Sequence, residues 1–150
     1  GFRHTEFFLF PTFFHEQVVK IRTPEAPIPA RREGEIEVRY FATLEAEKTI
    51  TSWETAAALE AFHILAESVV RQRFEYKDAG LYVALIRVFR LEPAWTLPDK
   101  PAYGGCRSWV NLPECPPDLR REPVISDAQH RRRSEELERL IGLSEQDRKG

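Results

Sequence analysis

The clearest pattern in the sequence is a strict alternation of apolar and polar side chains over residues 35–45. Side chains two residues apart on a strand point to the same face, so this segment predicts a half-buried strand with one wet face. The predicted inner face consists of Ile36, Val38, Tyr40, Ala42 and Leu44.

Two further segments have the composition of buried strands. The aromatic run over residues 7–10 is closed by Pro11, which cannot donate to a strand ladder. Residues 81–91 are apolar on both faces in their first half, as expected for a strand in a covered sheet. Pro93 and Pro98 follow, and we expect them to end this strand region.

Helical spacing appears in three other segments. Apolar residues recur every three or four positions between Leu59 and Phe74, which predicts one long helix over residues 53–74, with a turn at residues 77–80. A short helix is expected over residues 13–21, followed by a proline-rich connector to Gly34. Ser126 and Gln129 match a capping box, so a last helix should begin there and end near Gly142.

These elements together predict an α+β fold. We expect a small mixed sheet of three to five strands, with the long helix packed on one face and the C-terminal helix at the periphery. Residues 1–125 are interpreted as a single domain, and residues 126–150 as a helix and frayed tail that belong to it or are appended to it.

Composition narrows the class of protein. The chain is 42% hydrophobic and 31% charged, as in ordinary globular domains, and no apolar run approaches the ~18 residues of a membrane helix. With two cysteines and no visible secretory signal, we expect a reducing, cytoplasmic location. Because the chain contains no methionine, we expect it to begin after the start codon of its gene or to lack an opening segment.

The glycine-rich segment over residues 103–109 is the first candidate for chemistry. Gly104 and Gly105 free the backbone beside Cys106, and Arg107 could lower the pKa of that thiol. A small enzyme would use Cys106 as the nucleophile and His15 as its base, with His63 as the alternative base. Otherwise this segment is a glycine turn that lets Trp109 pack beside a buried thiol.

The sequence offers no motif for a metal or a nucleotide cofactor. Cys106 and Cys115 are too far apart for a zinc pair, and the four histidines are dispersed. No phosphate-binding loop, dinucleotide-binding glycine motif or nucleophile elbow occurs. We therefore expect neither a cofactor nor a metal site.

A set of arginines and aromatic residues is the second candidate. Arg87, Arg90 and Arg107 could meet on one basic face, with Tyr103 and Trp109 available for stacking. That mixture suits single-stranded DNA or RNA, although the net charge of −2 gives no general attraction to a polyanion. The alternative is that these arginines pair with the plentiful glutamates.

Three segments resemble an uncharacterised bacterial family, the domain of unknown function DUF1802. They are Phe-Leu-Phe-Pro-Thr-Phe-Phe-His-Glu-Gln at residues 8–17, Leu-Ile-Arg-Val-Phe-Arg-Leu at residues 85–91, and Tyr-Gly-Gly-Cys-Arg-Ser-Trp-Val at residues 103–110. The match covers most of residues 7–112, but Glu16 separates a His and a Gln that are adjacent in the family. The resemblance implies a fold unit and motif positions, and no known activity.

Three functions therefore stay open. The first is a nucleic-acid-associated binding module that uses the arginine and aromatic face. The second is a small enzyme built on Cys106, and the third is a purely structural interaction protein.

Overall fold

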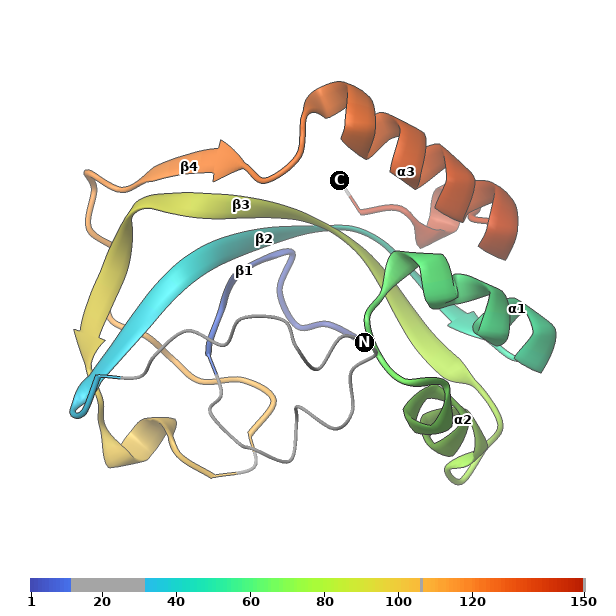
Figure 1. Ribbon diagram of the computed structural model, residues 1–150, viewed down its shortest axis with the longest axis horizontal. Coiled ribbons are helices and arrows are strands. Elements are labelled where there is room, and N and C mark those ends of the chain that lie inside the picture. The colour runs from blue at the N-terminus through green and yellow to red at the C-terminus, as the bar shows by residue number, and fades with distance from the viewer. Residues whose placement is uncertain (12–31, 106, 150) are drawn as a thin grey trace.

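Four antiparallel strands form one sheet in the order β1-β2-β3-β4 (Figure 1). They are β1 (Glu6–Leu9), β2 (Glu35–Ile50), β3 (Leu81–Pro98) and β4 (Arg120–Pro123) in a computed structural model that describes residues 1–11, 32–105 and 107–149. The predicted α+β class is confirmed. The sheet is antiparallel throughout instead of mixed, because neighbours in the sheet are also neighbours in sequence and no crossover connection is needed.

The sheet is four strands wide only near its middle. There β1 pairs with residues 40–43 of β2, and β4 pairs with residues 89–92 of β3. Beyond this region β2 and β3 continue together as a long two-stranded ribbon, ending in the pair Ile50 and Leu81. A ribbon of two strands cannot bury its own faces, so other parts of the chain must cover it.

The predicted alternation along β2 is interrupted at Arg39. A register shift between Val38 and Tyr40 changes which side chains face the core. Tyr40, predicted to be inside, is 39% exposed, whereas Phe41 is 4% exposed and packs on Phe8. The predicted strand is therefore confirmed, but the assignment of Tyr40 to its inner face is wrong.

β3 continues through Pro93, which the sequence predicted to be an end point. Val38 pairs with Trp95 and Tyr40 with Arg90, so residues 91–94 of β3 have no partner on β2. A proline in that stretch removes no hydrogen bond between the two strands, which is why it is tolerated inside the strand. Pro98 ends β3 as expected.

The predicted long helix over residues 53–74 is wrong. The segment forms α1 (Trp53–Ala58), the short 3-10 helix η2 (Leu59–Phe62) and α2 (Glu67–Glu75), which is a separate helix. The rings of Trp53 and Phe74 lie 5.5 Å apart, whereas a straight helix would separate these residues by roughly 30 Å. Packing of the two ends on each other therefore outweighs the continuous helical pattern.

The break between the two helices falls at His63. Its backbone is extended, with φ −149° and ψ 174°, and its Nδ1 accepts a hydrogen bond of 3.0 Å from the N–H of Leu65. This side-chain bond replaces one of the backbone bonds that a helix would supply.

The last helix, α3 (Asp127–Ile141), forms as predicted. Ser126 and Gln129 make the expected capping box, and Gly142 ends the helix in the left-handed conformation. Beyond it the chain turns through η4 (Glu145–Asp147) and reaches β2, where Lys149 donates its backbone N–H to the carbonyl of Glu45 at 2.7 Å. The predicted helix over residues 13–21 and most of the proline-rich connector lie outside the described residues.

Two hydrophobic clusters cover the two ends of the ribbon. One joins β1, the middle of the sheet and the chain after η3 (Pro101–Tyr103), around Val38, Leu91 and Trp95. The other joins the far end of the ribbon to the helices, around Ile50, Leu59, Phe74, Leu137 and Ile141. Among the residues with an assigned structure, none of the helices is long and apolar enough to cross a membrane.

Glu47 on β2 links three distant parts of the chain. It accepts hydrogen bonds from the backbone N–H of Phe2 at 2.9 Å and from the hydroxyl of Tyr82, and Lys149 lies 3.0 Å away. These contacts, that of Tyr82 first, lower the pKa of Glu47 from 4.5 to about 2. A carboxyl whose pKa is lowered by folding stabilises the fold when it is ionised.

We therefore expect Glu47→Gln to lower the free energy of unfolding at pH 7. The native carboxylate contributes fully above about pH 4.5, and this contribution is lost as the pH falls through 2, so the difference between variant and parent should shrink over that interval. Urea unfolding at several pH values measures it, with the exposed Glu33→Gln as control. A constant difference from pH 7 to pH 2 would show that the charge of Glu47 does not matter.

Candidate ligand cavity

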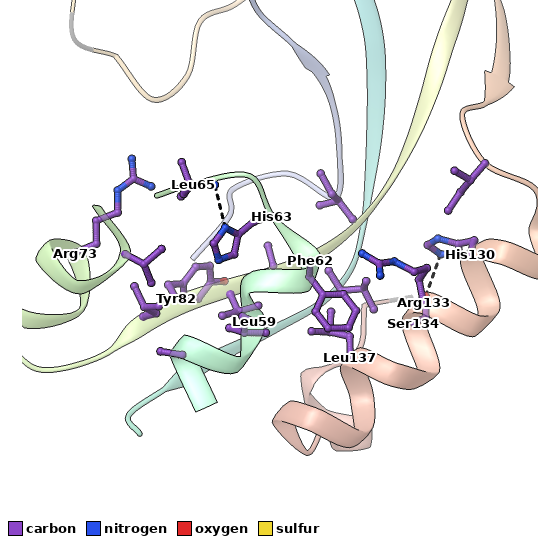
Figure 2. A pocket seen from close by; sticks show the side chains of 18 residues that line it. Leu59, Phe62, His63, Leu65, Arg73, Tyr82, His130, Arg133, Ser134 and Leu137 are labelled. Carbon is purple, nitrogen blue, oxygen red and sulfur yellow. Dashed lines mark hydrogen bonds between the residues drawn. The ribbon is translucent and has the colours of Figure 1, made fainter. Parts of the chain in front are cut away.

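A cavity of about 380 Å³ lies beside the two-stranded part of the sheet, between β3 and the helices (Figure 2). Helix α1 with η2, the start of the chain after η2, α2 and α3 all contribute to its walls. Its lining includes Leu59, Phe62, His63, Leu65, Arg73, Tyr82, Ala84, Ile86, Ile125, His130, Arg133, Ser134 and Leu137. Its volume falls in the range of small-molecule sites.

The cavity exists because the helical segment breaks at His63. Leu59 and Phe62 line one part of the wall from η2, and Val70 lines another from α2. A straight helix would place these residues along one line, whereas the break wraps them around the end of the ribbon. Leu137 of α3 completes the apolar part of the lining.

The polar groups of the lining are mostly cationic or imidazole side chains. Arg73, Arg133, His63 and His130 all line the cavity, and no Asp or Glu among the described residues does. Figure 2 shows Arg73 and Arg133 on opposite sides, with His63 between them. In apolar surroundings such groups favour a ligand that carries negative charge.

Arg133 is held in place by two contacts with η2. Its Nη2 donates to the carbonyl of Ala61 at 2.7 Å, and its guanidinium lies 4.6 Å from the centre of the Phe62 ring. A guanidinium has five N–H donors, so most remain available for a ligand. Arg133 therefore both links α3 to η2 and presents positive charge at the cavity.

Ser134, His130 and Glu45 form a chain of polar contacts that does not match a catalytic triad. His130 Nε2 contacts Glu45 Oε1, and the same nitrogen lies 3.4 Å from Ser134 Oγ. A triad needs the acid on one ring nitrogen and the nucleophile on the other. These three residues thus lack the arrangement that would activate Ser134.

Three of the sequence-predicted binding residues line a different hollow of about 1140 Å³. Tyr103, Arg107 and Trp109 lie along this groove, together with residues of β1 and the N-terminus. The Trp109 ring contacts Phe2, His4 and Phe7, with centroids 5.8, 5.3 and 5.5 Å apart. Gly105, at φ +90°, supplies the turn that brings Trp109 there.

Arg87 and Arg90 do not line this groove. Arg87 is not a free cation on a shared basic face: its side chain is 19% exposed, and its Nη2 donates to Asp127 Oδ1 at 2.6 Å. This contact lowers the pKa of Asp127, in the first turn of α3, and fastens that helix to β3. Arg90 is exposed and lies 3.9 Å from Glu92.

The predicted catalytic residues Cys106 and His15 lie outside the described residues. The neighbours of Cys106, Gly105 and Arg107, line the groove, whereas His63, the alternative base, lines the cavity. The two hollows share no lining residue in the described parts of the chain. In those same parts no cluster of three or more His, Cys, Asp or Glu side chains could hold a metal ion.

Sequence reasoning missed the polar lining on α3. It predicted a helix from Ser126 to about Gly142 and assigned no site residue to it, yet Arg133 lines the cavity. The signal was helical spacing: His130, Arg133, Ser134 and Leu137 lie three or four residues apart, on the face that the buried Leu137 and Ile141 fix as the inner one.

The fold and this cavity define a small α+β domain with a hollow between a strand ribbon and three helices. The chain belongs to the family described as Domain of unknown function (DUF1802), whose model matches residues 1–136. Comparison with curated proteins gave no match. Comparison with solved structures also gave none.

Leu137 tests whether the cavity wall is part of the stabilising core. It is 5% exposed and packs with Ile50 and Leu59, so Leu137→Ala should lower the free energy of unfolding by about 2–4 kcal/mol. Denaturant unfolding measures the loss, and Glu135→Ala, at an exposed position of the same helix, should change it by less than about 0.5 kcal/mol. Equal effects of the two substitutions would contradict the packing described here.

Proposed function

We propose that this domain binds an amphipathic organic anion in the cavity between β3 and the helices. The observation that carries the proposal is the combination of apolar walls with two arginines and two imidazoles, without a carboxylate among the described lining residues. The apolar part of the ligand would replace water along Leu59, Phe62 and Leu137. Its acidic group would meet Arg133, and Arg73 would attract it from the opposite side (Figure 2).

Physical chemistry favours this ligand over a neutral or cationic one. Removing an anion from water costs free energy unless charged donors replace the lost hydration, and the free N–H groups of Arg133 can do so. Burial of an alkyl or aromatic body contributes about 25 cal/mol per Å² of apolar surface. A cation would be repelled by both arginines and find no carboxylate partner in the described lining.

Octanoate and octanol, which share a chain length and differ in charge, test the proposal. Isothermal titration calorimetry should show that octanoate binds more tightly. Arg133→Gln should weaken octanoate about tenfold, since a hydrogen bond to a charged group contributes roughly 1.5–3 kcal/mol and tenfold corresponds to about 1.4 kcal/mol. Arg73→Gln should weaken it by less, because Arg73 acts from the opposite side of the cavity (Figure 2).

Arg132→Gln provides the matched control, because Arg132 is exposed on the same helix and does not line the cavity. It removes the same charge from the chain and should leave octanoate binding unchanged. Thermal melts of all three variants show whether each remains folded. Equal affinity for octanoate and octanol, or equal losses in Arg132→Gln and Arg133→Gln, would refute the proposal.

A second function is favoured by the groove that Tyr103, Arg107 and Trp109 share. The aromatic side chains of Tyr103 and Trp109 are suited to stacking with bases, and Arg107 and Lys100 to phosphate contacts. Glu6, Glu33 and Asp99 also line the groove and oppose a polyanion. Any binding of single-stranded RNA or DNA here would therefore depend on stacking more than on charge.

Fluorescence anisotropy with a labelled single-stranded oligonucleotide tests this second function. At low salt we expect binding that Trp109→Ala weakens about tenfold, because stacking contributes roughly 1–3 kcal/mol per base. Arg107→Gln should also weaken it, whereas Arg90→Gln, outside the groove, should not. The absence of any oligonucleotide binding at low salt would remove nucleic acid as a partner.

A further inference from the structure

The cavity lies directly against the outer edge of β3. Residues 81–86 all line it, as happens when a strand meets a hollow edge-on and not through one of its faces. The carbonyl of Val88 faces outward, since it accepts a bond of 3.1 Å from the N–H of Val124, next to β4. Backbone groups alternate along a strand, so those of Tyr82, Ala84 and Ile86 also face outward.

No described strand pairs with this part of β3. β4 pairs with residues 89–92 only, and β2 occupies the other edge. The corresponding edge of β2 is covered by other parts of the chain. The carbonyl of Thr5, just before β1, accepts a hydrogen bond from the N–H of Leu44, and Arg148 and Lys149 lie along residues 45–46. An open strand edge offers a row of donors and acceptors for another extended chain.

We propose that the natural ligand of the cavity is an extended, acidic peptide segment that adds to β3 as a further strand. This inference rests on the proposed function, because it uses the same cavity and the same cationic groups. The peptide would exchange backbone hydrogen bonds with Tyr82, Ala84 and Ile86. Its side chains would point alternately to the two faces of the sheet, and those on the side of Leu81, Val83 and Leu85 would meet the helices.

Charge and exposed apolar surface define the chemistry of this peptide. Arg73 comes from α2, just before the turn into Leu81, whereas Arg133 comes from α3, whose first residue is bonded to Arg87. Figure 2 shows the two cations on opposite sides of the cavity. We expect Asp or Glu near both ends of the segment and aliphatic side chains between them.

Apolar side chains at or next to the lining are exposed. Ile125 lines the cavity and is 37% exposed, and the exposed Ile64 and Val124 are neighbours of lining residues in the sequence. Clusters of exposed apolar residues commonly mark interaction sites.

The experiment measures the binding of an array of peptides to the full chain and compares it with the binding of octanoate. The array holds seven-residue peptides with glutamate at both ends and alternating valine and threonine or isoleucine and serine between them, and the control array has lysine at the ends. We expect the acidic peptides to bind, at least tenfold more tightly than the lysine peptides. Hydrogen exchange followed by NMR should show the amides of Tyr82, Ala84 and Ile86 becoming protected when peptide is added.

Ala84→Pro removes one outward N–H from the edge of β3. It should weaken the peptide at least tenfold, and clearly more than Ala84→Val, which enlarges the side chain at the same position but keeps the N–H. If the proline variant does not fold, peptides methylated on alternate backbone nitrogens give the same information: one of the two methylation patterns should abolish binding and the other should not.

The outcomes separate this inference from the proposed function. Octanoate binding without binding of any acidic peptide would overturn the peptide inference and leave the proposed function standing. Binding of neither would overturn both. Protection of the three edge amides in the free chain, or a dimer by sedimentation with those amides protected, would show the edge to be already paired and would also overturn the inference.

Discussion

The antiparallel pairing of β2 with β3 is the interaction on which the rest of the structure depends. The two strands run together well beyond the region that β1 and β4 cover, so the ribbon needs cover from other parts of the chain. Helices enclose one end around Ile50, and β1 and the chain after β3 enclose the other around Trp95. The domain thus has two hydrophobic clusters, each around one portion of the same pair of strands.

Much of this fold could be predicted from local sequence, because alternation and helix caps act within a few residues. The β2 alternation and the capping box at Ser126 both gave the correct element. The failures came from long-range packing. Residues 53–74 contain no proline or glycine, yet the helix breaks at His63 so that Trp53 and Phe74 can pack on each other. The register shift at Arg39 exposes Tyr40, because β3 has extra residues opposite Arg39.

The candidate cavity was harder to predict than the fold, since its residues come from separate elements. Arg87 looked like a free cation in the sequence, but Asp127, forty residues later, neutralises it. Arg133 is the last of three consecutive arginines, and the buried Leu137 and Ile141 further along the helix are what indicate which face of α3 is inside. The open edge of β3 has no local signal, because it depends on where β4 stops pairing.

The position of that edge has a consequence for how the domain meets other proteins. An open strand on a flat surface can pair with any exposed sheet, which leads to aggregation. Here η2 and α3 contribute walls beside Tyr82, Ala84 and Ile86, so the edge lies in a recess. In the proposed mode of binding, a folded sheet would have to displace these helices to pair with β3, whereas a single extended chain would not. The helices that complete the hydrophobic core would then also select extended segments as partners.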